Sequence, residues 1–77
     1  MYALIDHDDG VLKVDIEKLL GVYIKKDENA NSGFFVVEFR YPLNRIPPTT
    51  SVKMSRLESE EKIKAYIYTE LRNYLSK

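Results

Sequence analysis

The sequence predicts a small α+β domain, in which an antiparallel sheet of four to five strands carries one C-terminal α-helix on one face. Two patterns predict this class. Short segments rich in β-branched and aromatic residues alternate with turn-forming residues up to about residue 55. The remainder repeats apolar residues at three- and four-residue spacing, which is typical of an amphipathic helix. The length of 77 residues predicts one domain, residues 1–77. The chain has no cysteine, so a disulfide framework is excluded.

A first β-hairpin is predicted from residues 2–5 and 11–16. The apolar run of residues 2–5 stops at Asp-His-Asp-Asp-Gly, and the Asp9-Gly10 pair suits a tight turn because glycine accepts a positive φ. Residues 11–16 then alternate between apolar and polar, as expected of a half-buried strand. Residues 16–20 could instead form a single helical turn before the next strand.

A second hairpin is predicted from residues 19–26 and 34–41, which flank the polar residues 27–33. In the first of these strands, alternation divides the side chains between two faces. We expect Leu20, Val22 and Ile24 on one face, and Leu19, Tyr23 and Lys25 on the other.

The strand at residues 34–41 reads Phe-Phe-Val-Val-Glu-Phe-Arg-Tyr, the strongest strand signal in the chain. One of its faces is a complete core stripe: Phe35, Val37, Phe39 and Tyr41. The other face is apolar at Phe34 and Val36 and charged at Glu38 and Arg40. A single helix covers only one face of a sheet, so this second face points to a partner.

Pro42 ends this strand, because proline cannot donate to the ladder of hydrogen bonds. Residues 42–50 are then a stiff, proline-rich connector. Residues 51–55 alternate again and predict a short edge strand, with Val52 and Met54 inward. Lys53 on its outer side would protect the edge from unwanted pairing.

The last segment predicts a helix with Ser59 as its N-cap and acidic residues in its first turn, where the helix dipole favours negative charge. One apolar stripe follows, and it is expected to face the core. The stripe consists of Ile63, Tyr66, Ile67, Leu71, Tyr74 and Leu75.

Charge and composition describe an ordinary globular chain. The net charge is zero, although residues 1–32 hold seven acids and four bases while residues 33–77 hold five acids and eight bases. Proteins that hold a phosphate backbone usually show a clear basic excess, so nucleic acid is not the favoured partner. No apolar run has the length of a membrane span, and the N-terminus lacks the features of a signal peptide. We therefore expect a cytoplasmic protein with no membrane partner.

Residues that would carry enzyme chemistry are scarce. Asp6-His7-Asp8-Asp9 is the one acidic cluster with a histidine, but Gly10 is its fifth residue and a calcium loop needs glycine sixth. A solvated turn explains the cluster better. No serine lies in a glycine-flanked elbow, and no glycine-rich phosphate loop is present. The sequence predicts no catalytic residue, metal, cofactor or small-molecule substrate.

A protein-interaction surface is the functional prediction. It consists of Leu19, Tyr23, Phe34 and Val36, with Arg40 and Lys53 as charges at the rim. A contiguous apolar group of this kind requires a cover, either a second copy in a homodimer or a different protein. Two alternatives remain open: residues 1–16 could fold over the same face, or the face could bind single-stranded nucleic acid weakly through its aromatic rings.

Overall fold

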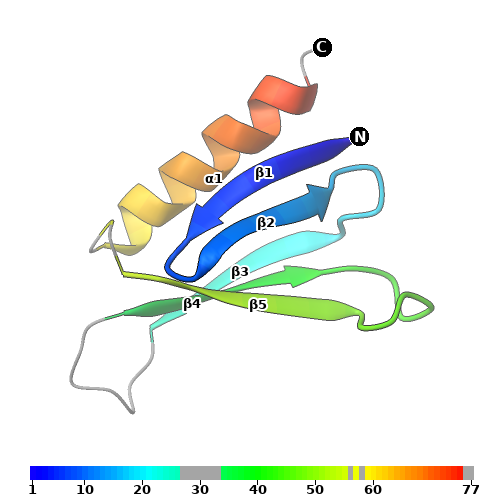
Figure 1. Ribbon diagram of the computed structural model, residues 1–77, viewed down its shortest axis with the longest axis horizontal. Coiled ribbons are helices and arrows are strands. Elements are labelled where there is room, and N and C mark those ends of the chain that lie inside the picture. The colour runs from blue at the N-terminus through cyan, green and yellow to red at the C-terminus, as the bar shows by residue number, and fades with distance from the viewer. Residues whose placement is uncertain (27–33, 56, 58, 76–77) are drawn as a thin grey trace.

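The computed structural model describes residues 1–26, 34–55, 57 and 59–75, and it confirms an α+β fold with a C-terminal helix (Figure 1). Its elements are β1 (Tyr2–His7), β2 (Gly10–Asp15), β3 (Gly21–Lys26), β4 (Phe35–Arg40), β5 (Thr49–Met54) and α1 (Glu60–Leu75). The predicted loop at 27–33 lies outside the described residues, and so do the side chains of Tyr74 and Leu75.

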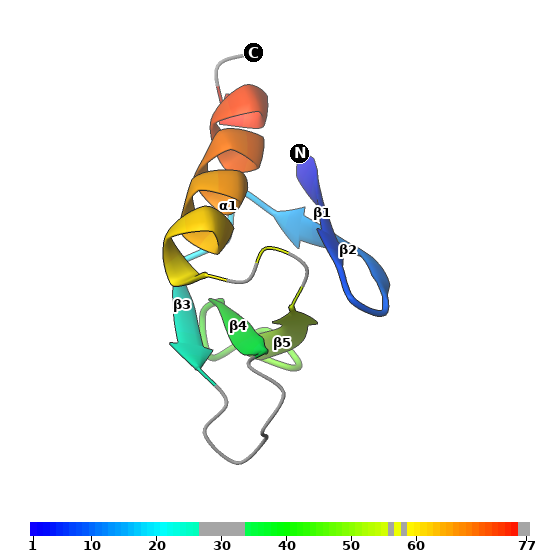
Figure 2. The ribbon, with the colours of Figure 1, turned by 90° about the vertical axis from the view of Figure 1, so that its left-hand side faces the viewer.

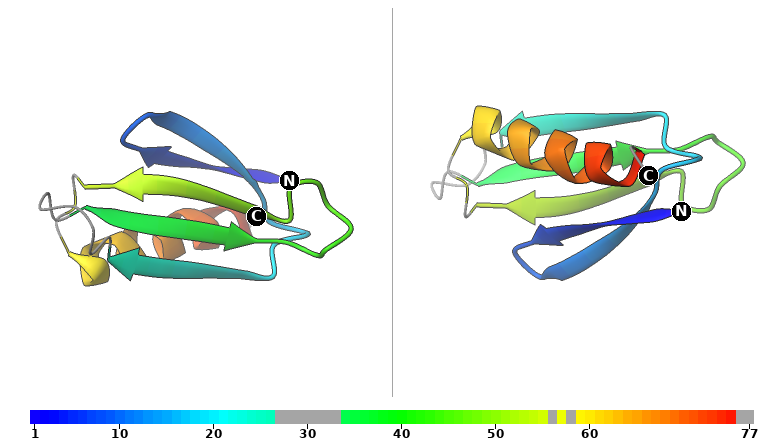
Figure 3. Two further views of the ribbon diagram at one scale, coloured as in Figure 1. Left: turned by 90° about the horizontal axis from the view of Figure 1, so that it is seen from below. Right: turned by 90° about the horizontal axis from the view of Figure 1, so that it is seen from above.

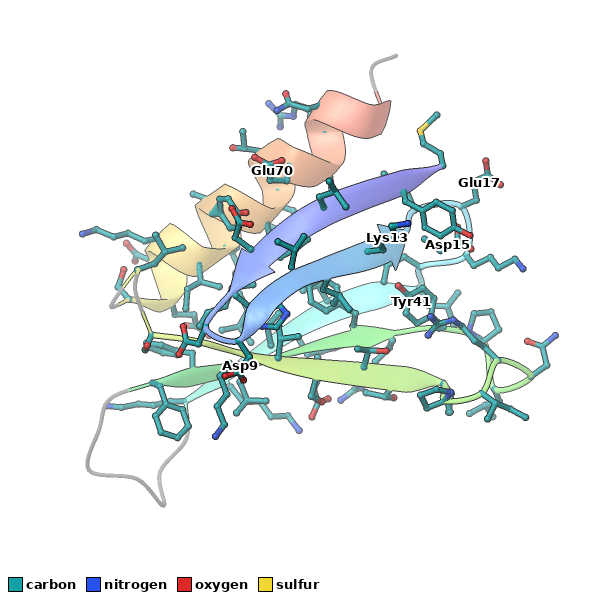
Figure 4. All side chains as sticks on the ribbon, in the orientation of Figure 1. Asp9, Lys13, Asp15, Glu17, Tyr41 and Glu70 are labelled. Carbon is teal, nitrogen blue, oxygen red and sulfur yellow. The ribbon has the colours of Figure 1, made fainter. Side chains whose placement is uncertain are left out.

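The strands form two antiparallel sheets, so the predicted single sheet is wrong. One sheet is the β1-β2 hairpin, and the other has the order β3-β4-β5. The chain breaks between them because the amides of Lys18 and Leu19 donate to the Asp15 carbonyl, at 3.3 and 3.0 Å. The residues after β2 thus form the helical turn that the sequence left as an alternative. The Asp15 amide in turn donates to the Tyr41 hydroxyl at 3.2 Å (Figure 4).

The hairpin turn lies one residue earlier than predicted. His7 pairs with Gly10, so Asp8 and Asp9 occupy the turn. Gly10 follows with a backbone φ of 145°, which residues other than glycine rarely adopt. The Asp8 carboxylate accepts hydrogen bonds from the amide and hydroxyl of Ser55, at 2.9 and 2.7 Å. The tip of the hairpin is therefore tied to the end of β5.

The hairpin and α1 both pack on the same face of the three-stranded sheet (Figure 2). The core between these layers comes from every element except β3, whose inward side chains are only partly buried. Its buried residues are Ala3, Ile5, Val14, Val37, Phe39, Tyr41, Val52, Met54, Ile63, Ile67 and Leu71. The inward positions predicted for β4, β5 and the described part of α1 are thereby confirmed, with Phe35 and Tyr66 partly buried at the margin.

Helix α1 is fixed at its start and in its middle. The Ser59 hydroxyl accepts a hydrogen bond from the Lys62 amide at 3.2 Å, which confirms the predicted N-cap. The Tyr66 hydroxyl accepts one from the Asp6 amide at 2.9 Å, which joins the helix to β1. Burial at this contact raises the pKa of Tyr66 above its ordinary value.

Ile67 is 1% exposed at the centre of the core, so Ile67→Ala should leave a cavity and lower the free energy of unfolding by roughly 2–5 kcal/mol. Thr69→Ala changes an exposed residue of the same helix and should shift stability by less than about 0.5 kcal/mol. Chemical denaturation followed by circular dichroism measures both. Equal effects of the two substitutions would contradict the packing described here.

Candidate functional site

No described helix or strand packs across the face of the three-stranded sheet turned away from α1, and only the hairpin tip, at His7 and Asp9, borders it (Figure 3, left). We call it the open face. β3 contributes Tyr23 and Lys25 to it, and β5 contributes Thr49, Ser51 and Lys53. The other side chains are Val36, Glu38 and Arg40 of β4, and Phe34 just before that strand. Five of the six residues predicted to form an interaction surface therefore lie together.

Leu19, the sixth, does not lie there. It packs against the core, while Leu20, predicted to face inward, is 71% exposed. The two-residue alternation fails at these positions because β3 begins only at Gly21 and the preceding residues belong to the turn. The alternative in which residues 1–16 fold over the open face is not what the structure shows: the hairpin packs beside the helix on the inner side, and only its tip, at His7 and Asp9, borders the open face.

Glu38 organises the charges at the centre of the open face. Its Oε1 lies 3.0 Å from the Lys25 Nζ, and its Oε2 accepts hydrogen bonds from the Arg40 Nη2 and Nε at 3.0 and 3.3 Å. Hydrogen bonds from Lys25 and then Arg40 hold the pKa of Glu38 below its ordinary value. With Lys53 added, the face carries three cations and one carboxylate, a net charge of +2.

Both aromatic rings of the open face lie beside a cation. The guanidinium carbon of Arg40 is 3.8 Å from the centroid of the Tyr23 ring, and the Lys53 Nζ is 5.0 Å from that of Phe34. A Cβ at Gly21 would stand 3.1 Å from the Cε2 atom of Tyr23, so the ring also lies close to the Gly21 main chain. The predicted apolar patch is therefore a surface of paired cations and rings.

Sequence reasoning missed a second exposed region, the β4–β5 connector. Leu43 and Ile46 are 91% and 94% exposed. Arg45 fixes the connector from within: its guanidinium carbon lies 3.7 Å from the Tyr41 ring centroid, and its Nη1 donates to the Pro47 carbonyl at 3.1 Å. The signal available in the sequence was two large apolar residues among prolines, which we interpreted only as a stiff connector.

The acidic cluster of the first hairpin has structural contacts. The Asp8 carboxylate binds Ser55, and the His7 Nδ1 accepts a hydrogen bond from the Asp9 amide at 3.2 Å. A surface pocket of about 260 Å³ adjoins the cluster and reaches Tyr66. Among the described residues, no three histidine or carboxylate side chains gather as metal ligands would.

No family model matches the chain, and the searches of curated proteins and of solved structures found no match either. Within the described part of the chain, no helix has both the length and the apolar character needed to cross a membrane.

The contacts of Glu38 predict a pH dependence. Because the folded pKa is depressed, Glu38 contributes stability above its ordinary pKa of 4.5, and the contribution is lost as pH falls through the folded value. Glu38→Gln should therefore destabilise the protein at about pH 7 and much less at about pH 3. Urea unfolding at the two pH values measures this. A difference between wild type and Glu38→Gln that stays constant with pH would contradict the assignment.

Proposed function

We propose that this chain is a non-catalytic protein-interaction module, an accessory, regulatory or inhibitory subunit that binds its partner through the open face. One observation carries the proposal: the hairpin and helix lie on the inner side of the sheet, and the outer face keeps Tyr23 exposed and Phe34 and Val36 half-buried, with only the hairpin tip bordering Val36. Adjacent aromatic and apolar side chains that remain partly accessible on one face are typical of interaction sites.

The charges of the open face support an acidic protein as the partner. Tyr23 is 47% exposed and Phe34 and Val36 are already half-buried, so covering them contributes less than the about 1.5–3 kcal/mol that each side chain would give from full exposure, against an association cost of about 4–15 kcal/mol. Contacts to the cations must therefore supply part of the affinity. Two copies meeting face to face would bring two surfaces of net charge +2 together, whereas carboxylates would pair with Arg40 and Lys53.

Capture from native lysate, with a matched pair of variants, tests the proposal. Phe34→Glu places a carboxylate on the open face, and Leu4→Glu places one at an exposed position of β1. The wild type and Leu4→Glu should retain the same acidic protein, and Phe34→Glu should lose it. Circular dichroism establishes that both variants fold. Equal capture by both would place the binding surface elsewhere.

Single-stranded nucleic acid is the second candidate, favoured by the pairing of a cation with each ring of the open face. Bases stack on aromatic rings and on guanidinium planes, and each stacked base contributes about 1–3 kcal/mol. Lys25, Arg40 and Lys53 would contact phosphates.

This candidate predicts an affinity that falls steeply as salt rises, because phosphate contacts release counterions. Fluorescence anisotropy of a labelled mixed-sequence oligonucleotide measures it at low and high salt. Phe34→Glu should abolish the signal and Leu4→Glu should preserve it. Absence of binding at low salt would remove nucleic acid as a partner.

A further inference from the structure

Three segments meet at the end of the molecule opposite the hairpin tip: the start of β1, the turn after β2 and the β4–β5 connector (Figure 1). They line a surface hollow of about 510 Å³. This volume falls within the range of about 300–1,000 Å³ that is typical of small-molecule sites. The lining residues are Tyr2, Asp15, Lys18, Pro42, Asn44 and Arg45.

The buried ring of Tyr41 fixes two sides of this hollow. Tyr41 is 4% exposed, and the guanidinium carbon of Arg45 lies 3.7 Å from the centroid of its ring. The Tyr41 hydroxyl accepts the hydrogen bond from the Asp15 amide at 3.2 Å (Figure 4). The Pro47 carbonyl accepts another from the Arg45 Nη1 at 3.1 Å. The guanidinium of Arg45 and the main chain of Asp15 are therefore positioned without any ligand.

Arg40 shows what a guanidinium stacked on a tyrosine ring binds in this protein. Its guanidinium carbon lies 3.8 Å from the centroid of the Tyr23 ring, and its Nη2 and Nε donate to the Glu38 Oε2 at 3.0 and 3.3 Å. Arg45 has the same stacking, but its Nη2 and Nε bond no group in the described part of the chain. Guanidinium groups bind carboxylates through such paired N–H groups. Arg45 therefore retains the pair of donors that Arg40 gives to a carboxylate.

The other two charged side chains of the hollow are also unpaired. Among the residues that the structure describes, neither Lys18 nor Asp15 forms an ion pair. The N-terminal ammonium of Met1 lies 3.6 Å from the Glu17 Oε1, so these two neighbouring charges offset each other. The hollow thus presents two cations and one carboxylate, a net charge of +1.

We propose that this hollow binds a small acidic amino acid, a molecule with two carboxylates and one ammonium. One carboxylate takes the Nη2 and Nε donors of Arg45 and the other pairs with Lys18, while the ammonium pairs with Asp15. The ligand complements the hollow charge for charge, and its single net negative charge offsets the single net positive charge of the site. The Tyr2 hydroxyl and the Asn44 amide add neutral hydrogen-bonding groups to the wall.

Asp15 distinguishes this ligand class from other anions. A phosphate or a simple dicarboxylate would satisfy Lys18 and Arg45, but its negative charges would be repelled by the Asp15 carboxylate. An ammonium group on the same molecule replaces this repulsion with an attraction. The hollow therefore favours an amino acid over an anion of equal size that lacks the ammonium.

The hollow lies outside the open face, because its residues come from β1, the turn after β2 and the connector. Ligand binding there goes beyond the proposed function and can fail without affecting it. The sequence analysis predicted no small-molecule site, because Arg45 joins Asp15 and Lys18 only through the contacts of Tyr41.

Titration with L-glutamate, followed by NMR of the main-chain amides, tests the site. The amides of Lys18, Asn44 and Arg45 should shift and saturate, and sodium chloride at the same ionic strength should not reproduce the shifts. Phe34→Glu, which alters the open face, should bind L-glutamate as the wild type does. Shifts no larger than those caused by sodium chloride would overturn the proposal.

Two exposed lysines provide a matched pair of variants. Lys18 lines the hollow, whereas Lys13 lies on β2 outside it. Lys18→Gln should raise the Kd for L-glutamate about twofold to fivefold, as expected for an exposed ion pair, and Lys13→Gln should leave it unchanged. Arg45→Lys should raise it about tenfold, because an ammonium cannot replace the paired donors of a guanidinium. Circular dichroism establishes that each variant folds. Equal Kd values for Lys18→Gln and Lys13→Gln would overturn the site.

Glutarate, which has two carboxylates and no ammonium, tests the ligand class. The wild type should bind L-glutamate at least about twofold more tightly than glutarate. Asp15→Asn, which keeps the main-chain contacts of this residue, should remove the preference. Equal binding of glutarate and L-glutamate to the wild type would overturn the contact between Asp15 and an ammonium, and with it the proposed ligand class.

Discussion

The bonding of Asp15 ends β2 at the point where the two sheets of the molecule separate. Its carbonyl accepts the amides of Lys18 and Leu19, and its amide donates to the Tyr41 hydroxyl from a distant part of the chain. With both main-chain groups engaged, β2 cannot pass directly into a ladder with β3. The hairpin therefore leaves the plane of the larger sheet and lies next to its β5 edge, on the same side as α1 (Figures 2 and 3). The open face exists because the hairpin and helix share one side.

Much of this architecture can be predicted from local pattern. The alternation in residues 34–41 identified Val37, Phe39 and Tyr41 as core residues, and the helical spacing identified Ile63 and Ile67. Both succeed because the pattern within one strand or helix shows which side of that element is buried. Ser59 could likewise be predicted as a cap, since capping involves residues only three apart.

The predictions from sequence failed where contacts between residues far apart in the chain determine the structure. Nothing in residues 11–20 indicates that the Asp15 amide will donate a hydrogen bond to the Tyr41 hydroxyl. All the strands were therefore predicted to belong to one sheet. The same turn exposed Leu20 and turned Leu19 inward. The cation beside each aromatic ring could not be predicted from the sequence either. Arg40 and Tyr23, for example, are on different strands and come together only through the pairing register of those strands.

The charge of the open face follows from this register rather than from composition. The chain as a whole is neutral, and its basic second half gave no clear indication of a partner. Antiparallel pairing nevertheless gathers Lys25, Arg40 and Lys53 on one side of the sheet around a single carboxylate, Glu38. Glu38 bonds both Lys25 and Arg40, but its single negative charge offsets only one of these two positive charges, and Lys53 beside Phe34 adds a further one. Overall neutrality is therefore compatible with a local excess of positive charge on one face of the sheet.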